Sequence, residues 1–458
     1  MSTLAFFAAV VLAQATPPAP AAAPAPAPVA KPATPAPAEP PAPSPAPRKK
    51  VLTLKEAIDS ARTQNLDIQQ LDAKVQAAAQ LTWKGWSTYL PQIGATAQIV
   101  RNQYEVSFAI PTGTGDPITT VVQPLVQTQG QVRLNQAIIA PQAILIIQNA
   151  YKAERTIDYN VQQARRDILF GVAQLYYDVA SLQELTAVQE RQVVLTKERE
   201  RDSRVRFEAG TGTKVGLLRA EIDRAQAEED LKRAQIDFQR ARLALATALD
   251  RPDDFDIVIP TSPPAPKGAN LEQQALDLRP DVKAAAEALD LAYGERMRIY
   301  MQYLPNIGVF GAYNYATTGT FNPNAFTWQV GIGLTWNIFD GGLREASIRE
   351  QSARIAEADA FKRQVDLNAV TRVKQAELDL QGAVANRAKA RERTGLAQEN
   401  ARLVDVAYKA GAATYLESTD SVQTLRQAEV GLVAESLNVD LATLKLLNAV
   451  GAFEEVNN

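Results

Sequence analysis

The apolar residues of this chain follow a helical period over most of its length. They recur at steps of three and four through residues 142–206 and 343–409, which contain no proline. Each stretch predicts one helix, which at 1.5 Å per residue would be roughly 100 Å long. Shorter stretches of the same character follow at about 215–249 and 415–450 and predict return helices. We therefore expect a mainly α-helical chain built on two long helical hairpins.

The second long helix carries a narrow apolar stripe that is rich in alanine. Small residues allow close antiparallel coiled-coil packing, and the Arg, Glu, Gln and Lys between them are expected to face water. The stripe consists of Ile355, Ala358, Phe361, Val365, Ala369, Val373, Ala376, Leu380 and Val384.

A shorter helical stretch precedes each pair of strand-like segments. Thr53 and Glu56 have the spacing of a capping box, so a helix is predicted to begin near Thr53 and to run to about residue 87. Its counterpart is expected at about 270–300. Both are expected to be collinear with the return helices and to complete a second row of the rod.

Alternation of apolar and polar residues replaces the helical period in four segments, the first of which follows Pro91. In 328–338, Trp, Val, Ile, Leu, Trp and Ile alternate with Gln, Gly, Gly, Thr and Asn, and residues 307–315 and 126–138 behave similarly. A soluble sandwich would also alternate in this way. The length of about ten residues, with aromatic residues near the ends, is typical of a tilted transmembrane strand. The joining segments 111–117 and 316–324 are expected to be exposed loops.

Four strands are too few to close around a lumen. Strands in lipid must form a closed barrel, because an open edge leaves backbone groups unsatisfied in hydrocarbon. If these strands cross a membrane, the barrel must therefore be shared between subunits.

The chain is one unit written twice. Residues 89–94 and 303–308 both carry the Tyr-Leu-Pro-x-Ile-Gly sequence at an offset of 214, and the turns of the two helical hairpins match at an offset of 201. The matching turn residues are Phe207 with Tyr408, Gly210 with Gly411, and Thr213 with Thr414. Glycine suits such a turn because it takes the left-handed conformation that ends a helix. We expect repeats at 51–250 and 271–451, a linker with one small strand at 251–270, and a tail at 452–458.

The amino-terminal residues have the features of a processed leader and a spacer. Residues 4–12 are apolar and end in Ala13-Gln14-Ala15, which fits a signal peptide of residues 1–15, with a buried apolar end as the alternative. Residues 16–50 are rich in Ala and Pro and predict a disordered linker.

Composition excludes several kinds of chemistry. With 48 basic and 51 acidic residues the net charge is −3, which gives no basic surface for nucleic acid. The sequence contains no cysteine and no histidine, so thiolate nucleophiles, Cys/His zinc sites and histidine acid–base catalysis are excluded. We expect no enzyme activity, no cofactor and no metal.

Several short sequences together resemble the TolC-like outer-membrane efflux proteins. They are Leu52-Thr53-Leu54-x-x-Ala57, Arg279-Pro280-Asp281, the two Tyr-Leu-Pro sequences, and Ile338-Phe339-Asp340-Gly341-Gly342. The resemblance implies a homotrimer in the outer membrane, with a 12-stranded barrel continuous with a periplasmic α-helical tunnel. It also implies outer-membrane lipid around the barrel, and a periplasmic adaptor (membrane fusion protein) with an inner-membrane transporter at the tunnel's inner end. The chain would be the passive exit duct of a tripartite efflux or type I secretion system.

The resemblance also implies site residues at the hairpin turns. Glu417 and Asp420 match the acidic pair that narrows the entrance, and Tyr408 matches the entrance tyrosine. Two acids in the first turn of an ordinary solvated helix are the alternative, because they favour the helix dipole. The adaptor would contact the turns through Phe207, Gly210, Thr213, Gly411 and Thr414.

The sequence departs from the family pattern beside these turns. Ala413 stands where an arginine is expected, and Val215 and Gly216 stand where a Thr-Asp pair would bind it. The latch that closes the entrance is therefore either absent or rebuilt from other residues. The competing interpretation of the whole chain is a structural trimeric coiled-coil protein of the cell surface or envelope, without transport activity.

Overall fold

The computed structural model describes residues 50–453, except 114, 261, 264, 265, 267–269 and 318–323. The predicted signal peptide, nearly all of the Ala/Pro-rich linker and most of the carboxy-terminal tail lie outside the described residues. So does most of the predicted loop at 316–324. The description below concerns the unit that begins at Lys49.

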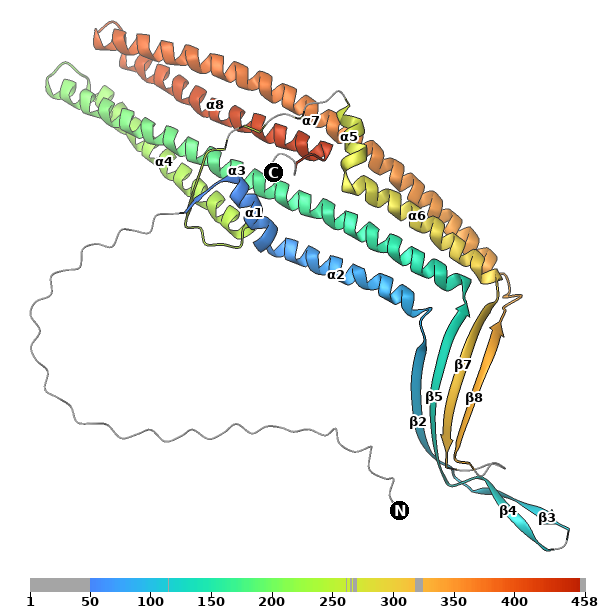
Figure 1. Ribbon diagram of the computed structural model, residues 1–458. Helices are drawn as coiled ribbons and strands as arrows, with labels where there is room; N and C mark the ends of the chain where they lie inside the picture. Colours follow the sequence, from blue (N-terminus) through green and yellow to red (C-terminus); the bar gives the residue numbers. More distant parts are fainter. Residues whose placement is uncertain are drawn as a thin grey trace, which may run out of the picture. The chain divides into compact units, whose positions relative to one another are not determined.

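Two long helical hairpins form the largest part of this unit (Figure 1). The first pairs α3 (Pro141–Glu208) with α4 (Lys214–Ala248), and the second pairs α7 (Leu343–Lys409) with α8 (Tyr415–Val450). The observed bounds lie within two residues of those expected from the sequence. The prediction of two long helices, each with a shorter return helix, is confirmed.

The helix expected before each strand pair is broken in two, so that prediction of one continuous helix is wrong. The first region forms α1 (Leu54–Gln64) and α2 (Leu66–Ser87), and the second forms α5 (Leu271–Leu278) and α6 (Pro280–Tyr300). Asn65 is extended, and its side chain accepts hydrogen bonds from the next helix at Asp67 N and Ile68 N. Arg279 is extended because Pro280 disfavours helix at the residue before it. The two breaks are themselves repeated, since 65 and 279 differ by the offset of 214.

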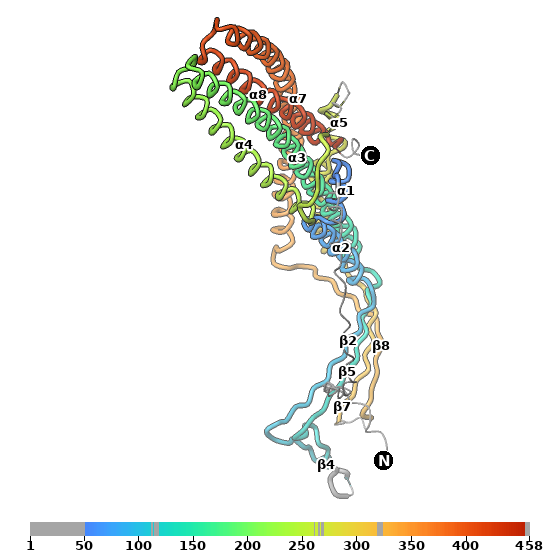
Figure 2. The backbone as a smooth tube through the Cα atoms, turned by 90° about the vertical axis from the view of Figure 1, so that its left-hand side faces the viewer, coloured from blue at the N-terminus to red at the C-terminus, as the bar shows by residue number. Residues whose placement is uncertain are grey.

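The helices lie side by side in rows that follow the repeat. Helix α2 packs along α3, α3 along α6, and α6 along α7 (Figure 1). Helix α4 packs on α3, and α8 packs on both α7 and α3 (Figure 2). Each shorter helix before the strands thus continues the row of a return helix, as expected. Among the described residues, no helix combines the length and the apolar character needed to cross a bilayer.

Four strands form one antiparallel sheet in the order β2-β5-β7-β8. They are β2 (Gln92–Arg101), β5 (Val126–Ile139), β7 (Asn306–Ala316) and β8 (Phe326–Thr335). Strand β8 is shorter than predicted, because Trp336 and Ile338 lie beyond its end. The two repeats meet within the sheet where β5 pairs with β7, which leaves β2 and β8 as its edges.

The expected exposed loop at 111–117 is instead part of a second hairpin, so that prediction is wrong. Strands β3 (Val106–Thr112) and β4 (Gly115–Gln123) pair with each other beyond the end of the four-stranded sheet (Figure 1). The pairing of these strands extends as far as Thr112 with Gly115. Glycine is common both in exposed loops and in the turns of β-hairpins, so its presence at 111–117 could not distinguish the two.

The main apolar core lies where α1 meets the middle of α3. There the expected small strand, β6 (Phe255–Ile257), pairs in parallel with β1 (Lys50–Leu52). The buried hydroxyl of Tyr176 lies 2.9 Å from the Leu52 carbonyl oxygen and 2.6 Å from that of Val258, and so joins α3 to these strands.

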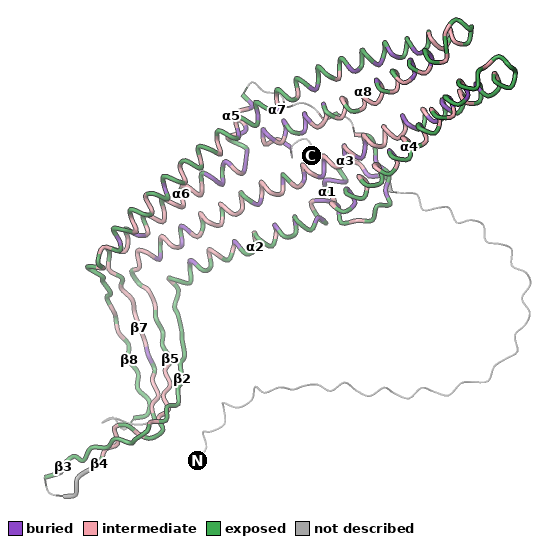
Figure 3. The backbone as a smooth tube through the Cα atoms, turned by 180° about the vertical axis from the view of Figure 1, so that it is seen from behind, coloured by how far each residue is buried: buried purple, intermediate pink, exposed green. Residues whose placement is uncertain are grey.

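Buried positions recur along α7 (Figure 3), and among them is a stripe of alanines spaced seven residues apart. This spacing is the coiled-coil repeat, and it lets α8 approach closely. Phe361 and Val384 were expected on the stripe but are exposed. The buried members are Ala369, Ala376, Ala383, Ala390 and Ala397.

Candidate functional site

The four-stranded sheet has one apolar face that is open to its surroundings. On β8, the side chains of Trp328, Val330 and Ile332 are 75%, 70% and 76% exposed. The apolar positions of the four strands lie opposite one another in the ladder: Ala95 pairs with Val132, Val132 with Tyr313, and Tyr313 with Trp328. A contiguous exposed apolar face of this kind indicates contact with lipid or a partner.

The opposite face of the same sheet is polar. Gln98 Nε2 donates to Gln129 Oε1 at 2.6 Å, and Gln131 Nε2 donates to Asn314 Oδ1 at 2.7 Å. These bonds join side chains across neighbouring strands, β2 to β5 and β5 to β7. The sheet therefore has one apolar face and one largely polar face, as its alternation predicts.

Each edge strand of this sheet has a neighbour on one side only. Strand β2 pairs with β5 and strand β8 pairs with β7, so the outer backbone groups of both edges lack a strand partner within the described chain. Such groups are costly to leave unpaired in a membrane. Among the described strands, the sheet is thus open at both edges.

At the other end of the helices, the two glycine turns have the same backbone geometry. Gly210 has φ 74° and Gly411 has φ 75°, in the left-handed region that favours glycine. In the first turn the amides of Thr211 and Gly212 donate to the Arg206 carbonyl oxygen. In the second, the amides of the two matching residues donate to the Ala407 carbonyl oxygen. The prediction of two equivalent turns is confirmed.

The two threonines after these turns cap the return helices. Thr213 Oγ1 accepts from the Gly216 amide at 3.1 Å, and Thr414 Oγ1 accepts from the Glu417 amide at 3.3 Å. Only the second helix has a complete capping box, in which Glu417 Oε2 accepts from the Thr414 amide at 2.7 Å. These bonds hold the pKa of Glu417 below its usual value.

The acidic pair lies where the sequence places it. Glu417 and Asp420 are both exposed, one helical turn apart at the start of α8. The capping contact of Glu417 is the one expected of an ordinary helix start. The geometry of a single chain therefore fits both interpretations of the pair.

The two aromatic residues of the turns contact basic groups. The Arg206 guanidinium carbon lies 4.8 Å from the centre of the Tyr408 ring, and Lys214 Nζ lies 5.5 Å from the centre of the Phe207 ring. Tyr408 also packs edge-on against Tyr415. Because Arg206 belongs to α3 and Tyr408 to α7, this contact joins the two hairpins near their tips.

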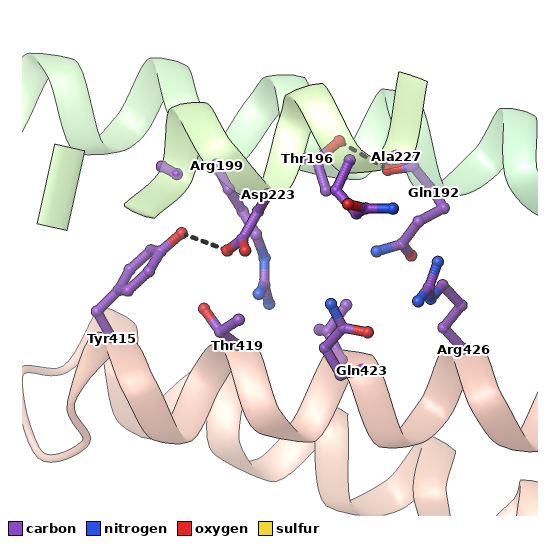
Figure 4. Close-up of a pocket in the computed structure, with 12 residues that line it drawn as sticks. Gln192, Thr196, Arg199, Asp223, Ala227, Tyr415, Thr419, Gln423 and Arg426 are labelled. Carbon is purple, nitrogen blue, oxygen red and sulfur yellow. Dashed lines mark hydrogen bonds between the residues drawn. The ribbon is translucent and has the colours of Figure 1, made fainter. Parts of the chain in front are cut away.

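Polar groups from α3, α4 and α8 form a further connection between the hairpins (Figure 4). The Tyr415 hydroxyl donates to Asp223 Oδ2 at 3.1 Å, and Arg426 Nη1 lies 2.5 Å from Asp230 Oδ2. Arg199 Nη1 donates to the Ser418 carbonyl oxygen at 3.3 Å. Burial, together with Asp223, raises the pKa of Tyr415 to about 12, so the hydroxyl keeps its proton at physiological pH.

Little in the sequence indicates this connection between the hairpins. Asp223 and Asp230 are seven residues apart, and therefore share one face of α4. Two acids on one helix face were the available signal that α4 faces polar partners on a neighbouring helix. At the offset of 201, Tyr415 corresponds to Lys214 and Arg426 corresponds to Ala225. Because neither pair is alike, the duplication could not reveal Tyr415 and Arg426 as partners.

Comparison with known proteins gives consistent matches. Residues 271–452 match the model of the family described as outer membrane efflux protein. The outer membrane efflux protein BepC of Brucella suis is 25% identical over 409 residues, which cover 87% of this chain and 85% of that protein. Outer membrane protein OprJ of Pseudomonas aeruginosa is 26% identical over 255 residues, or 52% of this chain and 50% of that protein.

Solved structures share the fold. The outer membrane protein VceC of Vibrio cholerae superposes with a TM-score of 0.73 at 17% identity, covering 87% of this chain and 96% of that one. The CmeC outer membrane channel of Campylobacter jejuni gives a TM-score of 0.72 at 15% identity, covering 87% and 86%.

Proposed function

Because the chain is a TolC-like outer-membrane efflux protein, we propose that three copies assemble into the passive exit duct of an envelope-spanning export system. The chain is an outer-membrane channel component of an efflux system. The open sheet, apolar on one face and polar on the other, is the observation that carries the proposal. One copy supplies a segment of wall, and only association encloses a bore.

The number of strands supports at least three copies. Two four-stranded sheets would give an eight-stranded barrel, whose interior is just wide enough for side chains to fill. Three sheets give twelve strands and leave room for water. The strand directions also allow closure, because successive neighbours in the order β2-β5-β7-β8 are antiparallel, so β8 of one copy would run antiparallel to β2 of the next.

The hairpin tips are the proposed docking site of a periplasmic adaptor, which in turn contacts an inner-membrane transporter. Exposed aliphatic side chains recur there at matching positions of the two repeats. Val205 and Val406 are each 57% exposed, and Val215 and Leu416 are 58% and 61% exposed. A repeated apolar surface suits one kind of partner that binds both hairpins.

We assign the entrance of the duct to the acidic pair of α8. Three copies would bring two carboxylates each, six in all, to the tunnel end. A ring of carboxylates attracts cations and opposes anions. Tyr408, which lies one turn before Gly411 and contacts Arg206, would line the same constriction.

Conductance tests the duct directly. Full-length protein extracted in detergent and inserted into a planar lipid bilayer is expected to give discrete, cation-selective channels. A protein that inserts as an assembly and stays electrically silent, even when the entrance acids are neutralised, would contradict the proposal and favour a purely structural coiled coil.

A further inference from the structure

In the half of the molecule near the glycine turns, the helices follow one another in the order α7-α8-α3-α4. Helix α8 packs against both α7 and α3, and α3 packs against both α8 and α4 (Figure 1). Within the described chain, α7 and α4 therefore have a helical neighbour on one side only in this half. The helical part thus has two open sides, just as the sheet has two open edges.

The open side of α7 carries a stripe of exposed leucines. Leu367, Leu378 and Leu396 are 66%, 66% and 68% exposed. Their spacings correspond to about three and five turns of helix, so the three side chains share one face. An apolar stripe left open to water in this way indicates a contact that one copy of the chain does not complete.

The matching face of α3 is covered inside the chain. At the offset of 201, the three leucines correspond to Arg166, Tyr177 and Leu195. Arg166 and Tyr177 are only 6% and 2% exposed, and Leu195 is half-buried. Tyr177 belongs to the same apolar cluster as two residues of α8, Leu444 and Leu447. The face that α3 buries against α8 is therefore the face that α7 leaves open.

The open side of α4 carries a second exposed apolar stripe. Its members are spaced by four, fourteen and seven residues, which keeps them on one helix face, and they are Leu218, Ile222, Ile236 and Leu243. At the offset of 201 they match residues of α8 that face α3. The first two matches line the polar cavity between the hairpins, and the last two pack in the apolar cluster around Tyr177 (Figure 4). In order, the matches are Thr419, Gln423, Leu437 and Leu444.

The contact between α3 and α8 has a single antiparallel register. Near the turns, Arg199 Nη1 donates to the Ser418 carbonyl oxygen at 3.3 Å. At the other end of α8, a Cβ at Gly451 would lie 3.5 Å from the Arg166 guanidinium. Residues 166 and 199 are 33 apart, and so are residues 418 and 451, so the register does not slip between the two contacts.

The same register would bring the two open stripes together. Leu378 corresponds to Tyr177, which is level with residue 440 of α8, and residue 440 corresponds to residue 239 of α4. Leu378 would therefore lie between Ile236 and Leu243 of a second copy. By the same steps Leu396 would be level with residue 221, next to Ile222. Apolar residues would thus meet at two levels roughly 27 Å apart along the helices.

We infer that the leucine stripe of α7 in one copy packs along the α4 stripe of the next copy, in the register that joins α3 to α8. The inference rests on the proposed assembly of identical chains and names the helical surfaces that join them. A second copy is the occupant that fits, because it presents to α7 an apolar stripe with matching levels. Head-to-tail contacts of this kind close into a ring when the rotation allows it.

Four positions give a test with internal controls, because the chain contains no cysteine. The in-register pairs are Leu396→Cys with Ile222→Cys, and Leu378→Cys with Ile236→Cys. The intact detergent-solubilised assembly is treated with a short bis-maleimide, and covalent dimers and trimers are expected after heat denaturation. Exchanging the partners, as Leu396→Cys with Ile236→Cys and Leu378→Cys with Ile222→Cys, uses the same thiols roughly 20–25 Å out of register. The exchanged pairs should give monomers, as should each single variant.

The outcomes separate this inference from the proposed function. Intact trimers without crosslinks in the in-register pairs would overturn the inference, because water or an adaptor would then cover the stripes, while leaving the duct in place. Exchanged pairs that crosslink as well as the in-register pairs would also overturn it, since the register would be wrong. A parent chain that forms no trimers would overturn both.

Thermal dissociation of the trimer gives a second measurement that needs no crosslinker. Leu378→Glu places a charge in the inferred contact and should lower the temperature at which trimers dissociate in detergent. Val194→Glu is the matched control on α3. Val194 is 59% exposed although α3 has both of its helical neighbours within the chain, so no further helix is expected to cover it. Equal dissociation temperatures for the two variants would contradict the inference.

Discussion

At the scale of single residues, Glu417 combines a structural contact with the proposed role at the entrance. Its carboxylate completes the capping box with Thr414, and its charge would contribute to the ring of acids. The resemblance identified the position, whereas the capping contact explains why an acid would be present there even in an inert rod. The two roles can be separated because glutamine can cap a helix without carrying a charge.

We predict that Glu417→Gln together with Asp420→Asn reduces cation selectivity and block by divalent cations in bilayer recordings. Helix α8 should keep its start, because the glutamine can still accept from the Thr414 amide. Glu417→Ala is the matched control, because it removes the capping hydrogen bond as well as the charge. If the charge-neutral double variant conducts and selects like the parent, the acids belong to the helix start alone.

The capping contact also has a consequence for stability. Hydrogen bonding lowers the pKa of Glu417 in the folded state, so its contribution is present above the ordinary glutamate pKa of about 4.3 and is lost as pH falls through the lowered value. Exchange of the Thr414 amide, corrected for the intrinsic rate, is expected to accelerate over that acidic range. The Glu417→Gln variant should lose this pH dependence. A variant that retains it would show that another group is responsible.

At the scale of elements, the sequence was sufficient for the long helices and for the faces of the sheet. The helical period of the apolar residues and the absence of proline were enough to predict α7 and α8. The breaks at Asn65 and Arg279 were not predicted. Both have a signal in the sequence, because Asn65 is a residue type that caps helices and Pro280 disfavours helix at the residue before it. The cross-hairpin contacts of Asp223 and Asp230 depend on which helices become neighbours, which no local pattern states.

The glycine turns should matter more for docking than for assembly. Gly210→Val and Gly411→Val force a branched side chain into the left-handed region, at a cost of roughly 1–2 kcal/mol or more for each turn. Gly395→Val, in an open position within α7, is the control. Pull-down of an adaptor should be lost in the turn variants, with trimers retained on unheated gels. Equal loss of binding and trimers would assign the turns to folding alone.

The ion pair between α4 and α8 should stabilise the packing of the two hairpins against each other. Arg426 and Asp230 are both partly buried, so breaking the pair should cost an amount between the roughly 1 kcal/mol of an exposed pair and the roughly 3–5 kcal/mol of a fully buried one. Asp230→Arg is expected to accelerate amide exchange near residue 426. The exchanged pair Asp230→Arg with Arg426→Asp should restore protection.

A lack of rescue in the exchanged pair would mean that Asp230 acts through other contacts. Hairpins that stay equally protected in the single variant would show that Tyr415 with Asp223, or Arg206 with Tyr408, is enough to hold the tips together.

At the scale of the whole molecule, duplication explains both what one copy has and what it lacks. The seam between the repeats is complete inside the chain, where β5 pairs with β7 and α3 packs on α6. The equivalent seam between β8 and β2 is open, with exposed aromatic and aliphatic residues on both sides. The two open edges, β2 and β8, differ from each other, so the β8 edge of one copy can join the β2 edge of the next in a closed ring of identical copies.

The mass of the native particle tests this account most directly. Native mass spectrometry of the full chain, extracted from membranes in detergent and then released from it, should give three copies of the polypeptide and no other stable species. A monomer that stays dissolved without detergent, with β2 and β8 protected from amide exchange, would contradict the central claim that one chain is an incomplete wall.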